Sequence, residues 1–233
     1  MLQTLCCALY ASGTSAGLLD TNDPGLKQIV SSVAFHVSFD DQTCDADLSK
    51  GDNRAMVNGT PVFIEGVSGK AVKRVNLRYP TEKNLDLDKP GSLAMWVFRT
   101  SNLEPHPEGL AGSWWMTEYS GNGYIGFEPR GEKTGMFWAH YFKNLANQSG
   151  TFTCDWKFDQ WQLLLITWRG PRWTVIVDGK TVSDGSLPRA IKQAEIAPRF
   201  MIGAAAVAVD EFTIFKHPLT DEEIKLLMKA ARH

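Results

Sequence analysis

The chain has 233 residues, of which 43% are hydrophobic and 21% are charged, which is ordinary for a globular protein. Its formal net charge is −2 and it has no Lys- or Arg-rich run, which excludes strong nucleic-acid binding through phosphate neutralisation. No apolar run approaches the roughly 20 residues that span a bilayer, so the sequence predicts no membrane-spanning helix.

The first 16 residues allow two interpretations. Residues 2–10 form a short apolar run, and Thr14-Ser15-Ala16 resembles a cleavage site, as in a weak signal peptide. No Lys or Arg precedes the run, however, so the segment can equally be an N-terminal strand or helix that packs on the domain.

The four cysteines depend on that choice. Cleavage would remove Cys6 and Cys7 and leave Cys44 and Cys154 as a pair. In an oxidising compartment these two could form a disulfide. The alternative is that both remain free, partly buried thiols.

Residues 18–32 predict a short amphipathic helix, because cap and turn residues at 20–24 precede apolar residues at helical spacing. We assign residues 1–32 to an N-terminal extension. Residues 33–39 then alternate apolar and polar side chains, which indicates a β-strand that runs into Asp40 and Asp41.

Further strands follow in series, separated by turn signals. The hairpin turns are predicted at Gly170-Pro171 and Asp178-Gly179. Both faces of the strand at 92–99 carry apolar residues, so both are expected to be buried. The predicted strands cover residues 61–65, 71–79, 92–99, 113–118, 124–128, 135–142, 161–169, 173–177, 180–182 and 200–203.

The last predicted strand, at residues 206–215, changes register at Asp210-Glu211. Val207 and Val209 share one face, whereas Phe212 and Ile214 fall on the other. Either the strand is buried on both faces or a bulge lies at the acidic pair. Two carboxylates in so apolar a run are costly unless they are hydrogen-bonded, paired or metal-bound.

The C-terminus switches to helical periodicity. Thr220 and Glu223 form a capping box, and apolar residues at 224, 227, 228 and 231 predict a helix over 220–231 with one buried face. No linker divides the strand series, so residues 33–233 are expected to form one all-β domain with a short C-terminal helix.

Several motifs, taken together and in order, resemble one family. They are Phe39-Asp40-Asp41, residues 66–71, 91–97, 161–167 and 175–180, and the closing stretch 209–224. Over residues 33–228 the chain is similar to the laminin-G-like jelly rolls of the concanavalin A-like lectin/glucanase superfamily. The resemblance implies a β-sandwich of two curved antiparallel sheets. It also implies that the first and last strands lie side by side, which would bring Asp40 near Asp210.

A structural calcium ion is one expectation. Calcium takes six to eight oxygen ligands from carboxylates and carbonyls, often on loops beside strand ends. The resemblance implies such an ion in many relatives, and Asp40, Asp41, Asp210 and Glu211 are the candidate ligands. Alternatively, the carboxylates accept hydrogen bonds from backbone donors or pair with Arg or Lys.

Carbohydrate binding is a second expectation, since sugar sites combine aromatic platforms with hydrogen-bonding groups. Aromatic residues gather in the segment that matches no motif, and the candidates are Trp114, Trp115, Tyr119, Trp138 and Tyr141. Strand alternation should send Trp114 and Trp115 to opposite faces, so at least one of them is expected in the core.

Glycoside hydrolysis is the enzymatic alternative that the superfamily allows. It needs a pair of carboxylates, which hydrolases of this fold place in an E-x-D-x-x-E pattern. The chain has no such pattern, and Glu118, Glu128 and Glu132 lie on separate predicted strands or turns.

The sequence therefore predicts a non-catalytic binding domain, for carbohydrate at a cell surface or in the extracellular space. The alternative is a structural or assembly protein, such as a surface, filament or virion component, that uses the jelly roll for protein contacts or self-association.

Overall fold

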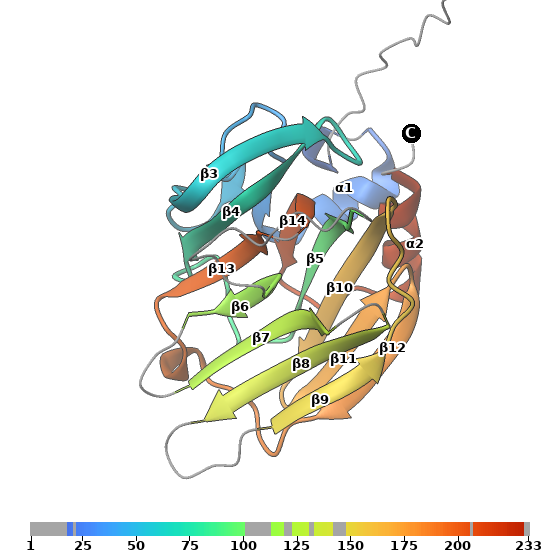
Figure 1. Ribbon diagram of the computed structural model, residues 1–233. Coiled ribbons are helices and arrows are strands. Elements are labelled where there is room, and N and C mark those ends of the chain that lie inside the picture. The colour runs from blue at the N-terminus through green and yellow to red at the C-terminus, as the bar shows by residue number, and fades with distance from the viewer. Residues whose placement is uncertain are drawn as a thin grey trace, which may run out of the picture.

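The computed structural model describes residues 18–20, 22–100, 113–118, 123–130, 133–141, 148–205 and 207–230 (Figure 1). Strands dominate these residues, as expected. The strands are β1 (Val33–Val37), β2 (Leu48–Ser49), β3 (Met56–Glu65), β4 (Lys70–Pro80), β5 (Gly91–Phe98), β6 (Trp115–Thr117), β7 (Gly123–Arg130), β8 (Thr134–Tyr141), β9 (Gln148–Thr153), β10 (Trp161–Arg169), β11 (Arg172–Val177), β12 (Lys180–Ser186), β13 (Arg199–Ala204) and β14 (Ala208–Phe215). The helices are η1 (Leu18–Asp20), α1 (Pro24–Ser31), η2 (Gln193–Glu195) and α2 (Asp221–Ala230).

The described strands pair antiparallel along one hydrogen-bonded path. Its order is β12-β11-β10-β5-β14-β4-β13-β6-β7-β8-β9, with β1 joined to β14 and β2, and β3 joined to β4. The path curls until its two ends, β12 and β9, approach each other. The fold is thus all-β with a nearly closed sheet, in agreement with the predicted fold class at that level.

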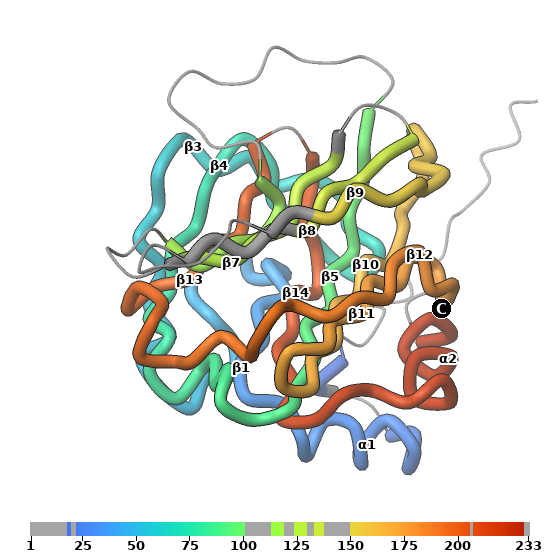
Figure 2. The backbone as a smooth tube through the Cα atoms, turned by 90° about the horizontal axis from the view of Figure 1, so that it is seen from below, coloured from blue at the N-terminus to red at the C-terminus, as the bar shows by residue number. Residues whose placement is uncertain are grey.

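Strand β5 is buried on both faces because each face meets a different hydrophobic cluster. Leu93 and Met95 face the main core inside the curled sheet. Ala94 and Trp96 face a second cluster, in which α1 and α2 cover the outer side of β5 and β10. Figure 2 shows both helices on the side of β5 that faces away from β7 and β8.

Both predicted helices begin at the expected caps. The Asp23 side chain accepts hydrogen bonds from the backbone N–H groups of Gly25 and Leu26, and so caps α1. In α2, the Thr220 hydroxyl accepts from the Glu223 N–H while the Glu223 carboxylate accepts from the Thr220 N–H, as predicted. In the described residues, no helix combines the length and apolar composition needed to cross a membrane.

The register change in β14 was predicted to reflect either burial of both faces or a bulge at the acidic pair, and the structure shows both. All eight of its residues are buried, and a bulge separates Asp210 from Thr213 in the pairing with β5. Glu211 in the bulge has a φ of 50°, a left-handed conformation that is costly for a residue with a side chain. Before the bulge, Val209 pairs with β4, and after it Phe212 pairs with β1. The bulge therefore lies where β14 exchanges one neighbour for another.

Four strand segments were not predicted: β2, β9, the first half of β3 and the second half of β12. β9 has the sequence Gln-Ser-Gly-Thr-Phe-Thr, whose polar residues give little apolar signal. β3 contains Gly59 and Pro61 and has a bulge between Gly59 and Val62. Among the described strands β3 pairs only with β4, and an edge strand tolerates proline because its outward N–H needs no partner.

Candidate functional site

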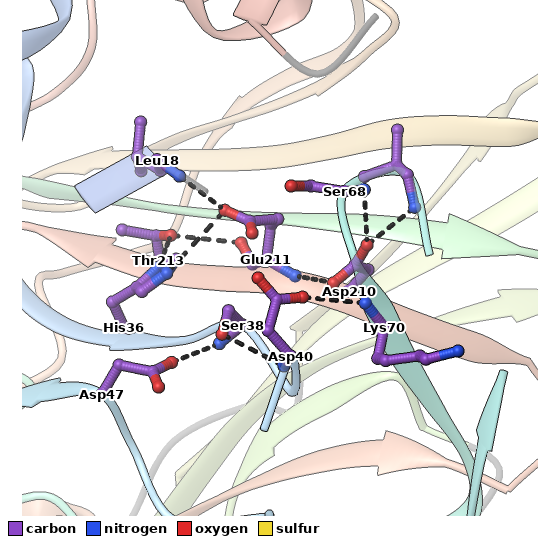
Figure 3. Close-up of polar contacts among 11 residues, drawn as sticks. Leu18, His36, Ser38, Asp40, Asp47, Ser68, Lys70, Asp210, Glu211 and Thr213 are labelled. Carbon is purple, nitrogen blue, oxygen red and sulfur yellow. Dashed lines mark hydrogen bonds and ion pairs between the residues drawn. The ribbon is translucent and has the colours of Figure 1, made fainter. Parts of the chain in front are cut away.

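A buried acidic cluster joins the beginning and the end of the fold. Asp40 follows β1, Asp210 and Glu211 lie in the bulge of β14, and the turn between β3 and β4 packs against them (Figure 3). Asp210 is fully buried and Glu211 is 8% exposed. Since buried carboxylates need polar partners, their hydrogen bonds define what this cluster can do.

Asp210 is held by three backbone N–H groups. Its Oδ2 accepts from the N–H of Val67 at 2.7 Å and of Ser68 at 3.2 Å, and its Oδ1 accepts from the N–H of Glu211 at 2.8 Å. The carboxylate lies directly against Gly66, where a side chain would collide with it. Burial, and then the charge of Glu211, raises the pKa of Asp210 to about 9, although the three N–H groups oppose this.

Asp40 is held by the same turn. Its Oδ1 accepts from the backbone N–H of Lys70 at 2.8 Å. Gly69, with a φ of 50°, lies against the Asp40 carboxylate and has no room for a side chain. The β3–β4 turn thus connects the end of β1 to the bulge of β14 through two carboxylates.

Glu211 faces a histidine. Its Oε2 accepts from the N–H of Leu18 at 3.4 Å and lies 3.8 Å from Nε2 of His36. The Thr213 hydroxyl donates to the Glu211 carbonyl, so Nδ1 of His36, 2.8 Å from Thr213 Oγ1, is the donor to that hydroxyl. Burial, and then the charge of Asp40, raises the pKa of Glu211 to about 8, and burial lowers the pKa of His36 to about 4. Both side chains are therefore largely uncharged near neutral pH.

The cluster fits a structural clasp better than the expected calcium site. Both carboxylate oxygens of Asp210 already accept hydrogen bonds from backbone N–H groups, and these N–H groups lie where a cation would bind. Asp41 is exposed, and Asp40 is bonded to the turn. Within the described ranges, no group of three or more His, Cys, Asp or Glu side chains is arranged to hold a metal ion. The calcium ion stays a prediction that these contacts do not support.

The structure corrects two of the five aromatic candidates. Trp114 and Trp115 are 1% and 0% exposed and both belong to the main core, so neither offers a face to a sugar. Strand alternation did not apply, because β6 begins only at Trp115. Trp138 and Tyr141 lie in β8, but their side chains are outside the described residues, as is all of Tyr119.

Cys44 and Cys154 are free and buried, so the predicted disulfide is not formed in this structure. Cys44 lies in the segment after β1, where its carbonyl accepts a hydrogen bond from the Tyr79 hydroxyl at 2.6 Å. Cys154 follows β9, and its N–H donates to the Lys133 carbonyl. Burial raises the pKa of each thiol to about 11, which makes both poor nucleophiles.

A surface cleft of about 370 Å³ was missed by the sequence analysis. It lies between the segment that joins β4 to β5 and the end of β14. We call it the lysine-rimmed cleft: the charged residues that line it are Lys83, Asp86, Lys89 and Lys216, and apolar residues that include Pro90, Trp168 and Phe215 form its base. These residues come from separate stretches of sequence, and no motif connects them.

Comparisons with known proteins agree with this fold. A family model described as "Concanavalin A-like lectin/glucanases superfamily" matches residues 75–225. No curated protein matches the chain in sequence.

Among solved structures, one similar protein is domain 4 of AbnA, an extracellular GH43 arabinanase from Geobacillus stearothermophilus, in complex with arabinotriose. It is 17% identical with a TM-score of 0.62, and the match covers 84% of this chain and 98% of that domain.

Two toxin domains are similar in the same way. The binding domain of botulinum neurotoxin DC in complex with SialylT is 13% identical (TM-score 0.64), and the match covers 87% of this chain and 52% of that one. The botulinum neurotoxin serotype D ligand-binding domain in complex with N-acetylneuraminic acid is 11% identical (TM-score 0.64), with 88% and 52% covered. This chain spans about half of each toxin domain, and at such identities the likeness establishes the fold alone.

Proposed function

The chain belongs to the concanavalin A-like lectin/glucanase superfamily, and we propose that it is a non-catalytic carbohydrate-binding domain. The observation that carries the proposal is the match to almost the whole of a domain solved with arabinotriose. Two toxin domains of the same fold, solved with sialylated or sialic-acid ligands, support it. The finer description as a two-sheet jelly roll, working outside the cell or at its surface, is part of this proposal.

The acidic residues support a binding role rather than hydrolysis. Hydrolysis needs a matched pair of carboxylates, one of which gives up or takes a proton at the scissile bond. Glu118 instead pairs with Arg78 and lies 4.0 Å from Arg199, and Glu128 lies 3.4 Å from the Ser113 hydroxyl. Asp210 and Glu211 are engaged in the buried clasp, where a glycosidic oxygen has no access.

A glycan array with the whole chain tests the proposal, followed by calorimetric titration of the best ligand. The array includes arabinotriose, other neutral oligosaccharides and sialylated glycans. We expect at least one glycan to bind saturably to the folded protein, with no release of reducing sugar on long incubation. If no glycan binds at millimolar concentration to protein whose circular dichroism shows a folded β-domain, the proposal is wrong. Release of reducing ends would contradict its non-catalytic part.

One observation favours the alternative of an assembly protein. Edge strand β3 exposes Met56 (51%) and Val57 (48%), two apolar side chains beside unpaired backbone groups. Sedimentation velocity of the wild-type chain and of a Met56→Lys, Val57→Lys variant separates the two functions. A dimer or larger species that the variant abolishes would favour assembly, and a monomer in both would count against it.

A further inference from the structure

The walls of the lysine-rimmed cleft are fixed before any ligand binds. Trp168 Nε1 donates to the carbonyl of Lys89 at 2.8 Å, which ties the rim to β10. The Asn84 side chain is fully buried: it donates to the carbonyls of Asp52 and Pro80 and accepts from the Gly51 N–H. A preformed cleft is what ligand sites usually have, because ordering the walls then costs no binding energy.

The charges on the rim favour an anion. Three lysines and one aspartate line the cleft. Lys89 pairs with Asp86 at 3.1 Å, which neutralises one lysine. In the described part of the chain, the one ion-pair contact of Lys83 is a distant one with the exposed Glu82, at 3.9 Å, and Lys216 makes no ion pair. Two lysines therefore remain for an incoming negative group.

The base of the cleft favours a ligand with an apolar face. Pro90 is exposed, whereas Trp168 and Phe215 beneath it are 2% and 1% exposed, so the apolar surface open to a ligand is the Pro90 ring together with the alkyl stems of the exposed rim lysines. A bare inorganic anion would contact the lysines and leave this surface unused. A volume of about 370 Å³ lies within the range of small-molecule sites, and it can hold a sugar ring with its C–H face or an N-acetyl methyl group on the base.

We propose that the lysine-rimmed cleft binds an acidic sugar, with the sugar carboxylate at Lys83 and Lys216 and the apolar face of the ring over Pro90. This inference rests on the proposed carbohydrate-binding function and adds the class of sugar and its position on the molecule. A carboxylate beside two lysines makes charge-assisted hydrogen bonds, which are stronger than those of neutral hydroxyl groups.

The test compares N-acetylneuraminic acid with its methyl ester, which keeps the ring and removes the charge. Each is titrated into the whole chain and followed by ligand-observed NMR, at low and high salt. We expect the ester to bind about tenfold more weakly, since a hydrogen bond to a charged group contributes about 1.5 kcal/mol or more. High salt should weaken the binding of the acid and leave the binding of the ester unchanged.

Three variants locate the site. Lys83→Ala and Lys216→Ala remove exposed side chains, so both should fold, and each should weaken binding of the acid several-fold. Lys180→Ala is the matched control. Lys180 is also exposed, but it lies opposite Val177 in the pairing of β11 with β12. Val177 is at the far end of the β10–β11 hairpin from Trp168, so Lys180 is remote from the cleft. This variant should leave binding unchanged.

The outcomes separate the two proposals. Equal affinity for acid and ester, or no effect of the Lys83 and Lys216 variants, would overturn the acidic-sugar inference while carbohydrate binding stands. Competition by inorganic phosphate with the same affinity as the sugar would also overturn it, because the cleft would then bind anions without using its base. If neither acidic nor neutral glycans bind, the proposed function fails with it.

Discussion

Replacing Glu211 by Gln should change how the stability of the protein depends on pH. The Glu211 carboxyl is buried against His36, and its pKa is raised to about 8 by burial first and by the charge of Asp40 second. A Gln amide fits the same contacts: its oxygen can accept from the Leu18 N–H, and its NH₂ can donate to Nε2 of His36. Glu211→Gln therefore removes the titration and preserves the packing.

The magnitude follows from proton linkage. An unfolded glutamate has a pKa of about 4.3, so between pH 6.5 and 8 the unfolded chain is ionised while folded Glu211 retains its proton. The folded state thus binds more protons, and stability falls as pH rises. Over this interval the loss is about 2 kcal/mol, at about 1.4 kcal/mol per pH unit and less near the pKa. The contribution of His36 has the opposite sign but occurs in both proteins and cancels.

Urea denaturation at pH 6.5 and pH 8 measures this difference. We expect the free energy of unfolding of wild type minus that of Glu211→Gln to fall by about 2 kcal/mol between the two pH values. Glu82→Gln, at an exposed site, is the control, and its free energy of unfolding should change with pH as that of wild type does. If the free energies of unfolding of wild type and Glu211→Gln change equally between the two pH values, the conclusion that Glu211 keeps its proton in the folded protein is refuted.

Three further predictions concern the clasp and the last helix. Asp210→Ala should destabilise the fold by about 3 kcal/mol in urea denaturation, because it removes the acceptor of the part-buried Val67 N–H and of the buried Ser68 N–H; a loss below 1 kcal/mol would contradict the clasp. Millimolar calcium, and then EDTA, should leave the melting temperature unchanged, and a rise that EDTA reverses would restore the calcium site. Thr220→Ala should cost about 1 kcal/mol by removing the cap of α2, whereas Thr220→Ser should cost little.

The sequence predicted those parts of the fold that depend on local pattern. Alternation located β1, and apolar runs beside turn signals located β5 and β10. The capping box located α2, and turn residues located the Asp178-Gly179 turn, where both residues have positive φ. The acidic pair in β14 marked a bulge because two carboxylates interrupt an apolar run. In these cases the physical cause lies within a few residues of the observed element.

The contacts of the acidic cluster could not be predicted in the same way. Asp210 is satisfied by backbone N–H groups about 140 positions away in sequence, and every residue type except proline carries such a donor. The available signal was Gly66 and Gly69, since each leaves room for a carboxylate. Trp114 and Trp115 were misjudged because aromatic residues suit a core as well as a sugar platform, and burial depends on neighbours distant in sequence.

The most direct test of carbohydrate binding is an amide NMR titration of the whole chain with N-acetylneuraminic acid. We expect saturable chemical-shift changes that are concentrated in residues 82–90 and around Lys216, with residues 66–70 of the clasp unaffected. Changes confined to another surface would move the site away from the cleft. A spectrum that stays unchanged at saturating concentrations of both this sugar and arabinotriose would contradict the account.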